Sequence, residues 1–381
     1  MRRFLSIIIA LFALISVMAS ASDGRSADSR ILELRKKADR GDVAAQYSLG
    51  LNYLMGDGVK QNLKEAVKWF TMAAKQGNAD AQLNLGYCYA DGRGVKQDLE
   101  EAVKWFTLAA KQGNDYAQLH LGNCYANGRG VEKNWEEAVK WFALAAKQGN
   151  DFAQLKLANC YYNGEGIEKN LEEAVKWYGK AAEKEKAEAQ LMLGNCYYNG
   201  EGVEKDLKEA VKWYGKAAEK GKAEAQLMLG NCYYNGEGVK KDYRKAVECF
   251  TRAAEKRVAK SQFMLGYCYA LGYGVEKDKK EAFKWYLKAA DQGFAEAQFY
   301  LGSCYAQGYG VEKNEKGAAV WYRKAADQGF AQAQFMLGNC YALGYGVEKD
   351  KKEAVEWYRK ASDQGNEDAK EALKRLEEKP Q

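Results

Sequence analysis

Apolar residues in this chain recur with the period of an amphipathic α-helix, and the helices that they predict come in pairs. In one such pair Ala189, Leu193 and Cys196 stand at positions i, i+4 and i+7, so that they share one face of a helix. Gly200 and a second glycine two residues later then end this helix, because glycine adopts the left-handed conformations that turn the chain. A second apolar helical face follows around Trp213. The pattern predicts a helix-turn-helix unit.

The unit recurs every 36 residues, and single residue types mark the period. Cysteine marks the first helix, at Cys88, Cys124, Cys160, Cys196, Cys232, Cys268, Cys304 and Cys340. Tryptophan marks the second, at Trp69, Trp105, Trp141, Trp177, Trp213, Trp285, Trp321 and Trp357. A fixed period of this size indicates stacked units that bury their apolar faces against one another. We therefore predict an all-α fold, an α/α superhelix (solenoid) of nine 36-residue repeats.

The repeats divide the chain into four predicted parts. Residues 1–21 have a positive start, an apolar run and a small-residue cleavage pattern, Ala19-Ser20-Ala21, which is typical of a signal peptide. Residues 22–41 form a flexible segment and a capping helix, residues 42–365 the nine repeats, and residues 366–381 a charged C-terminal capping helix. The apolar run is shorter than the ~20 residues of a membrane-spanning helix, although an uncleaved anchor is the alternative. We expect a secreted or periplasmic protein without stable membrane insertion after cleavage.

The ends of the second helices carry recognisable capping residues. Asp206 stands where its carboxylate can cap the helix start, and Glu209 three residues later completes the pattern of a capping box. Lys245 and Gly317 break this pattern in the sixth and eighth repeats. At the other end, Glu185 and Arg257 replace the glycine that follows the helix, and strain results if the backbone there has a positive φ.

The repeat closely resembles the Sel-one-like repeat (SLR), a relative of the tetratricopeptide repeat. The resemblance covers about Asp42 to Gly365 and rests on Ala189-Gln190, Leu193-Gly194, Gly200 to Val203 and Ala217-Ala218. It implies antiparallel helix pairs in a right-handed superhelix and a role as an adaptor or scaffold in protein complexes. Some secreted, cysteine-rich members bind β-lactams or act on host cells, which supplies an alternative function: a secreted repeat protein that binds or hydrolyses cell-wall or β-lactam ligands. Those members pair two cysteines per repeat, whereas this chain has one.

Charge and residue chemistry favour a binding protein over an enzyme. The chain has 58 basic and 52 acidic residues that are well mixed along it, which argues against a nucleic-acid-binding stripe. His120 is its one histidine, and we expect it to be an exposed polar residue with no catalytic partner. No serine has a lysine three residues later, so the nucleophile motif of penicillin-recognising enzymes is absent. We predict a non-catalytic scaffold with no cofactor and no metal site.

The repeated cysteines are predicted to be unpaired thiols of the core. Equivalent positions on successive repeats should lie roughly 8–10 Å apart, whereas a disulfide needs Cα atoms within about 7 Å. The same spacing disfavours a shared metal ion. Cys249 is different because it occupies the second helix, where the period places a tryptophan. A bridge from Cys249 to Cys232 or Cys268 therefore stays open.

The face of the first helix that is opposite to the apolar stripe is the predicted binding surface, on the concave side of the superhelix. We call these residues the first-helix stripe. They are Tyr116, His120, Asn123, Asn159, Met192, Asn195, Met228, Asn231, Met264, Tyr267, Tyr300, Ser303, Met336 and Asn339. Amides and thioethers combine hydrogen bonding with adaptable apolar contact, which suits a protein or an extended peptide. The alternative is that these residues only decorate a solvated face and were copied by duplication.

Overall fold

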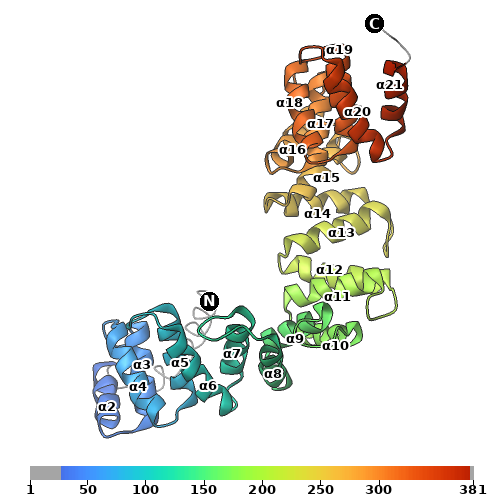
Figure 1. The fold of residues 1–381 in the computed structure, drawn as a ribbon. Helices are drawn as coiled ribbons and strands as arrows, with labels where there is room; N and C mark the ends of the chain where they lie inside the picture. Colours follow the sequence, from blue (N-terminus) through green and yellow to red (C-terminus); the bar gives the residue numbers. More distant parts are fainter. Residues whose placement is uncertain (1–26, 378–381) are drawn as a thin grey trace. The chain divides into compact units, whose positions relative to one another are not determined.

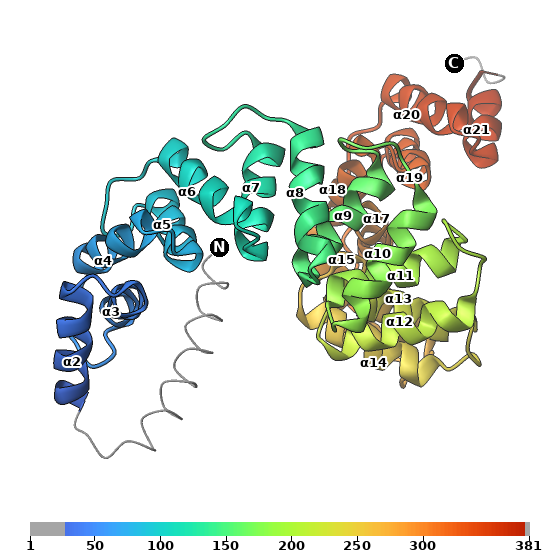
Figure 2. The ribbon, with the colours of Figure 1, turned by 90° about the horizontal axis from the view of Figure 1, so that it is seen from below.

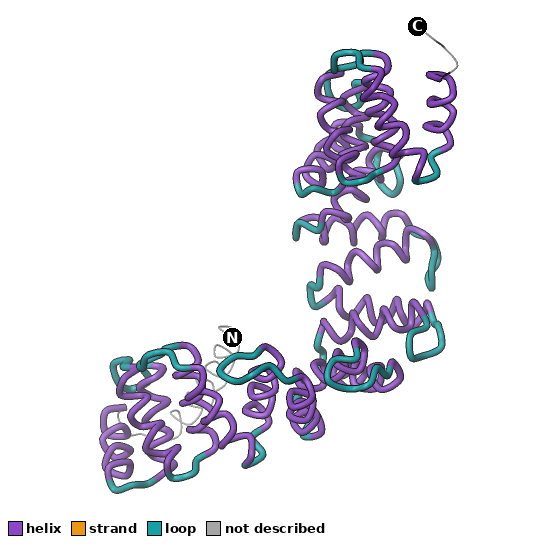
Figure 3. Tube along the Cα trace, in the orientation of Figure 1, coloured by secondary structure: helices purple, strands orange, loops and turns teal. Residues whose placement is uncertain are grey.

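The computed structural model describes residues 27–377 as an all-helical chain, which confirms the predicted fold class. Figure 3 shows helices joined by short loops, and the described part of the chain contains no strand. The predicted signal peptide, residues 1–21, lies outside the described residues.

Each repeat contributes one first helix and one second helix. The first helices are α3 (Val43–Met55), α5 (Ala79–Asp91), α7 (Asp115–Asn127), α9 (Asp151–Asn163), α11 (Ala187–Asn199), α13 (Ala223–Asn235), α15 (Ala259–Leu271), α17 (Ala295–Gln307) and α19 (Ala331–Leu343). The second helices are α4 (Leu63–Lys75), α6 (Leu99–Lys111), α8 (Trp135–Lys147), α10 (Leu171–Glu183), α12 (Leu207–Glu219), α14 (Tyr243–Glu255), α16 (Lys279–Asp291), α18 (Glu315–Asp327) and α20 (Lys351–Asp363).

The helices form two compact units, which divide between Lys184 and Glu185. The first unit contains α2 (Ala27–Asp39) to α10, and the second contains α11 to α21 (Glu367–Glu377). Within each unit every helix packs against the next one in the chain (Figures 1 and 2). The helix α2 packs against α3 and α21 packs against α20, so that each covers the outer repeat of its unit.

The apolar faces predicted from the sequence form the core of each repeat. Ala189 and Cys196 on α11 are at most 1% exposed, and Tyr214 on α12 is fully buried. The two helices approach closely at Gly194, where an added Cβ would lie 2.7 Å from the ring of Tyr214. A larger residue there would force the helices apart, so this glycine sets the spacing within the repeat.

The two glycines of each turn have different structural roles. Gly200 ends α11 in the left-handed conformation, with φ 78°, and its N–H donates to the carbonyl of Cys196. The second glycine lies against the preceding repeat. A Cβ on Gly238 would be 2.1 Å from the carbonyl oxygen of Leu207, so the backbones of successive repeats meet where no side chain fits.

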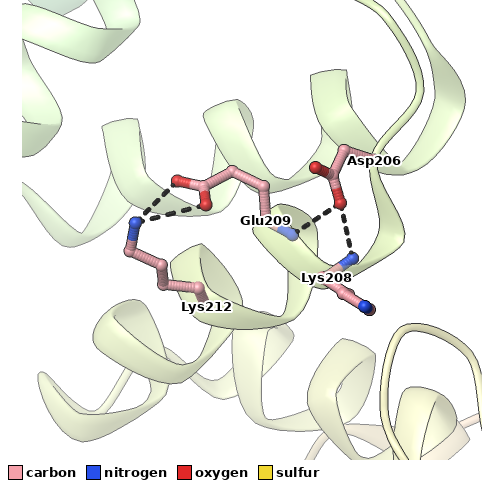
Figure 4. Close-up of polar contacts among 4 residues, drawn as sticks. All are labelled: Asp206, Lys208, Glu209 and Lys212. Atoms are coloured by element: carbon pink, nitrogen blue, oxygen red, sulfur yellow. Dashed lines mark hydrogen bonds and ion pairs between the residues drawn. The ribbon is translucent and has the colours of Figure 1, made fainter.

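Asp206 caps α12 as predicted, but the capping box is not formed. The Asp206 carboxylate accepts the backbone N–H of Lys208 at 2.9 Å and of Glu209 at 3.0 Å (Figure 4). The Glu209 carboxylate instead pairs with Lys212 at 3.0 Å. A capping box needs the Asp206 N–H as the donor to the Glu209 carboxylate. This N–H already donates to the carbonyl of Tyr197, at 2.9 Å.

Buried glutamines link each first helix to its surroundings. Gln82 on α5 donates its Nε2 to the carbonyl of Ala74, while its Oε1 accepts from Gln112, the residue after α6, at 2.7 Å. The sixth repeat has the same glutamine, Gln226, but the residue after its second helix is Lys256. Lys256 donates to the carbonyl of Gly221 instead, and among the described residues the buried Oε1 of Gln226 has no hydrogen-bond partner.

The backbone strain expected at two replaced glycines is present. Glu185 has φ 60° and Arg257 has φ 64°, and they are the non-glycine residues with positive φ in the described chain. A side chain in this left-handed region costs on the order of 1 kcal/mol or more. The sixth repeat therefore combines an unsatisfied acceptor with a strained turn.

Candidate functional site

His120 is not the exposed residue that the sequence indicated. Its ring lies 4.8 Å from that of Tyr87, edge to face, and 5.7 Å from that of Phe106, in a stacked arrangement. Burial lowers the pKa of His120 from 6.5 to about 4, because the charged form loses its water. The imidazole is therefore neutral at physiological pH, and it belongs to the wall of a cavity rather than to a solvated face.

That cavity has a volume of about 310 Å³ and lies in the first unit. Its apolar walls include Phe106 of α6 and Phe152 of α9. The lining also includes His120 and Asn123 of α7 and Lys156 of α9. Two members of the first-helix stripe therefore line the same pocket as a cation of the next repeat. The lining contains Lys156 and Arg129 and no carboxylate. We call this hollow the α7 pocket, and its chemistry suits an apolar group next to a negative charge.

Most polar members of the first-helix stripe already have partners within their own repeat. In each case the hydroxyl of a tyrosine nineteen residues later donates to the side chain. The bonds are Tyr178 to Asn159 (2.8 Å), Tyr214 to Asn195 (2.9 Å), Tyr322 to Ser303 (3.2 Å) and Tyr358 to Asn339 (2.7 Å). Asn159, Asn195, Ser303 and Asn339 are half-buried. These four side chains stabilise the packing of the two helices, which the sequence pattern did not reveal.

Asn123 and Asn231 differ from these four because the residue nineteen positions later is Phe142 and Phe250, respectively, which has no hydroxyl. No hydrogen bond to either side-chain amide occurs within residues 27–377. Both asparagines are half-buried. The side-chain oxygens of these two amides therefore have no tyrosine donor, and the choice of tyrosine or phenylalanine on the second helix is the sequence signal that separates the two classes.

The apolar members of the stripe are mostly half-buried as well. Met192, Met228, Met264 and Met336 are all in this class, and Tyr116 is the exposed member, at 37%. Tyr267 and Tyr300 lie 6.1 Å apart and both contact Phe263, at 6.3 Å and 5.3 Å. Phe263 was missed from the sequence, although the leucine of the earlier repeats changes to phenylalanine at 263, 299 and 335.

All nine cysteines are free thiols, and seven of them are buried. Burial raises the pKa of Cys268 to about 12 and that of the half-buried Cys249 to about 11, so these thiols stay protonated at neutral pH. The bridge from Cys249 to Cys232 or Cys268, which the sequence left open, is not formed in this structure. Within the described chain no group of three or more His, Cys, Asp or Glu side chains could hold a metal ion.

Comparison with known proteins identifies the repeat. The family described as Sel1 repeat matches nine consecutive segments, at 43–78, 79–114, 115–150, 151–185, 187–222, 223–257, 259–294, 295–330 and 331–366. A search of the curated proteins gave no significant match. None of the helices between residues 27 and 377 has the length and apolarity needed to cross a bilayer.

Two solved structures are similar over nearly the whole chain. A protective antigen of uropathogenic Escherichia coli with an SLR fold is 37% identical, with a TM-score of 0.74, and the match covers 90% of this chain and 81% of the antigen. A Sel1 repeat protein of Oxalobacter formigenes is 30% identical, with a TM-score of 0.62, and the match covers 93% of this chain and 94% of that protein.

Proposed function

Because this chain belongs to the Sel1 repeat family, whose members generally act as scaffolds for protein interactions, we propose that it is a non-catalytic scaffold that binds a partner protein through the first-helix stripe. The observation that carries the proposal is the α7 pocket. It opens among stripe residues, and Asn123 in its lining has an amide that the repeat itself does not use.

The pocket supports binding of a peptide segment of the partner. An apolar side chain of that segment would fill the space between Phe106 and Phe152, while the amide of Asn123 would bond to the peptide backbone. Lys156 and Arg129 are exposed at this pocket and favour a carboxylate next to the buried side chain. In the second unit Asn231 offers a further free amide beside Met228.

We place the protein in the periplasm or outside the cell. The basis is the signal-like sequence of residues 1–21, which lies outside the described residues. The relative from Escherichia coli is a protective antigen, and this supports a location that antibodies reach. Fractionation of cells that produce the full chain tests the location. Recovery of an unprocessed chain in the cytoplasm would refute it.

A pull-down from envelope or host extract tests the binding face. The mature chain is compared with a pocket variant, Asn123→Lys with Lys156→Glu, and with a control variant, Lys111→Glu, at an exposed position on a second helix. We expect one partner to be held by the parent and the control and to be lost by the pocket variant. Circular dichroism confirms that all three fold. Retention by the pocket variant would move the binding face away from the stripe.

A small cell-wall or β-lactam ligand is the second candidate, and the dimensions of the α7 pocket favour it. A volume of about 310 Å³ lies at the lower end of small-molecule sites, and two cations without a carboxylate suit a ligand that carries a carboxylate. Calorimetric titration of the mature chain with a muropeptide and with a β-lactam tests this. Saturable binding that Lys156→Glu abolishes would support it, and hydrolysis of a chromogenic β-lactam would overturn the non-catalytic assignment.

A further inference from the structure

The sixth repeat differs from the fifth at the start of its second helix. The four differences are Glu204/Lys240, Leu207/Tyr243, Lys208/Arg244 and Glu209/Lys245. Two of them replace a glutamate by a lysine, so residues 240–245 carry four more positive charges than residues 204–209. Three of these positions lie in the first turn of α14, and α14 also differs from α12 further along, where Glu248 replaces Lys212.

The structure gathers these residues around a recess of about 720 Å³ in the second unit. Lys240, Lys241, Arg244 and Lys245 line it and are exposed, together with one carboxylate, Asp242. In the fifth repeat a glutamate neutralises the lysine one turn later. In the sixth repeat none of the four cations forms an ion pair with a described residue. The recess therefore presents four exposed cations and one carboxylate.

Aromatic rings give this recess a rigid side. Tyr243 stacks on Tyr273 of the following turn, with ring centroids 4.7 Å apart and planes 9° from parallel, and Tyr234 meets it edge to face at 5.2 Å. The Nζ of Lys241 lies 5.6 Å from the ring centroid of Tyr243, and the Nζ of Lys245 lies 5.3 Å from the ring centroid of Tyr233. The fifth repeat has a leucine in place of Tyr243, so the aromatic platform and the cations occur together in the sixth repeat.

The backbone around the recess distinguishes between anions. The Asp242 carboxylate accepts the N–H of Arg244 at 3.0 Å and of Lys245 at 3.1 Å, so these donors at the start of α14 are already used. The backbone N–H groups with which a helix start can hold a compact phosphate are therefore not available, and the positive charge sits on long side chains at an open surface. This arrangement fits carboxylates that are spread along an extended chain. We propose that the recess binds an acidic peptide segment of a partner protein, with Tyr243 as the contact for its apolar atoms.

This acidic-peptide site uses none of the residues of the first-helix stripe, and the inference goes beyond the proposed function. Changes at the recess and changes at the α7 pocket therefore test the two proposals separately. A recess variant that still binds the acidic peptide would refute this inference alone, and a pocket variant that still holds the partner protein would refute the proposed function alone.

The test is fluorescence anisotropy with the mature chain, residues 22–381, and a labelled peptide of about ten residues with alternate glutamates, roughly 33 Å long when extended. The main variant combines Lys240→Glu, Tyr243→Leu, Arg244→Lys and Lys245→Glu. At these four positions it carries the residues of the fifth repeat, which already folds in this chain. We expect saturable binding by the parent, weakened by added salt, and a loss of affinity of about tenfold or more in the variant.

A matched control separates a local site from total charge. The control Lys60→Glu with Lys96→Glu changes the net charge by the same four units, at the positions equivalent to Lys240 in the first and second repeats. It should change the affinity for the peptide less than about twofold. An equal loss in control and main variant would overturn the proposal, as would equal binding of a peptide with glutamine in place of glutamate. Displacement of the label by pyrophosphate or single-stranded DNA at lower concentration than by unlabelled peptide would also overturn it.

Discussion

Lys256→Gln should stabilise the sixth repeat, although it replaces a side chain that has a hydrogen bond. Gln226 is 5% exposed and its Oε1 has no partner among the described residues, while the equivalent Gln262 accepts from Gln292 at 2.7 Å. A glutamine at position 256 places the same donor beside Gln226, thirty residues away as in the seventh repeat.

The size of the effect follows from the two groups that change. A buried acceptor without a partner costs about 1–3 kcal/mol, and the new hydrogen bond removes this cost. The bond from Lys256 to the carbonyl of Gly221 is lost, but it is exposed, and water replaces it at a cost of less than about 1 kcal/mol. The free energy of unfolding of this repeat should rise by about 1 kcal/mol. Arg257→Gly adds a similar gain by removing the side chain from φ 64°.

Amide hydrogen exchange is the suitable assay, because repeats open locally and a whole-chain melting curve averages over them. Exchange in α13 and α14 should slow about fivefold in Lys256→Gln. The reverse change, Gln292→Lys, removes the donor from Gln262 and should speed exchange in α15 and α16 by a similar or larger factor. Unchanged exchange in both variants would refute the view that these glutamine bonds contribute to stability.

Three further predictions concern single side chains. Burial gives His120 a pKa of about 4 in the folded chain, so the unfolded chain binds the proton first as the pH falls. The free energy of unfolding should therefore fall by up to about 3 kcal/mol from pH 6.5 to pH 4. Denaturant unfolding of His120→Met, which carries the residue of the fifth repeat, should lack this pH dependence. Gly238→Ala should lower the melting temperature markedly, because its Cβ would lie 2.1 Å from the Leu207 carbonyl oxygen, and an unchanged melting curve would contradict the contact. Tyr214→Phe should cost about 1 kcal/mol in denaturant unfolding, since only the hydroxyl that bonds to Asn195 is lost.

The fold could be predicted from the sequence because each repeat presents the same local signals. The period of Cys196 and Trp213, the glycine at position 200 and the cap at Asp206 all act within a few residues of each other, and stacking then follows from the apolar faces. The prediction of a capping box at Asp206 and Glu209 was wrong because of a contact with a residue outside this short stretch of sequence. The N–H of Asp206 is taken by the carbonyl of Tyr197 on the other helix, which a pattern along one helix does not show.

The candidate site could be predicted only in outline. The stripe residues lie on the first helices, but the helical period does not tell which of them bond to the second helix. Asn195 is tied to Tyr214, while Asn231 faces a phenylalanine, and the difference depends on a contact between residues nineteen positions apart. His120 was misjudged because Tyr87 and Phe106, which enclose it, come from the preceding repeat.

Site-specific photocrosslinking tests the central claim, that the first-helix stripe is the face that binds protein. A photoreactive residue is placed at Asn123 or Met228 on the stripe, or at Leu108, which is 45% exposed on a second helix. We expect the two stripe positions to crosslink to a shared partner protein in the envelope or host extract, and Leu108 to give no crosslink to it. Crosslinks from Leu108 alone would show that the second helices, and not the first-helix stripe, form the binding face.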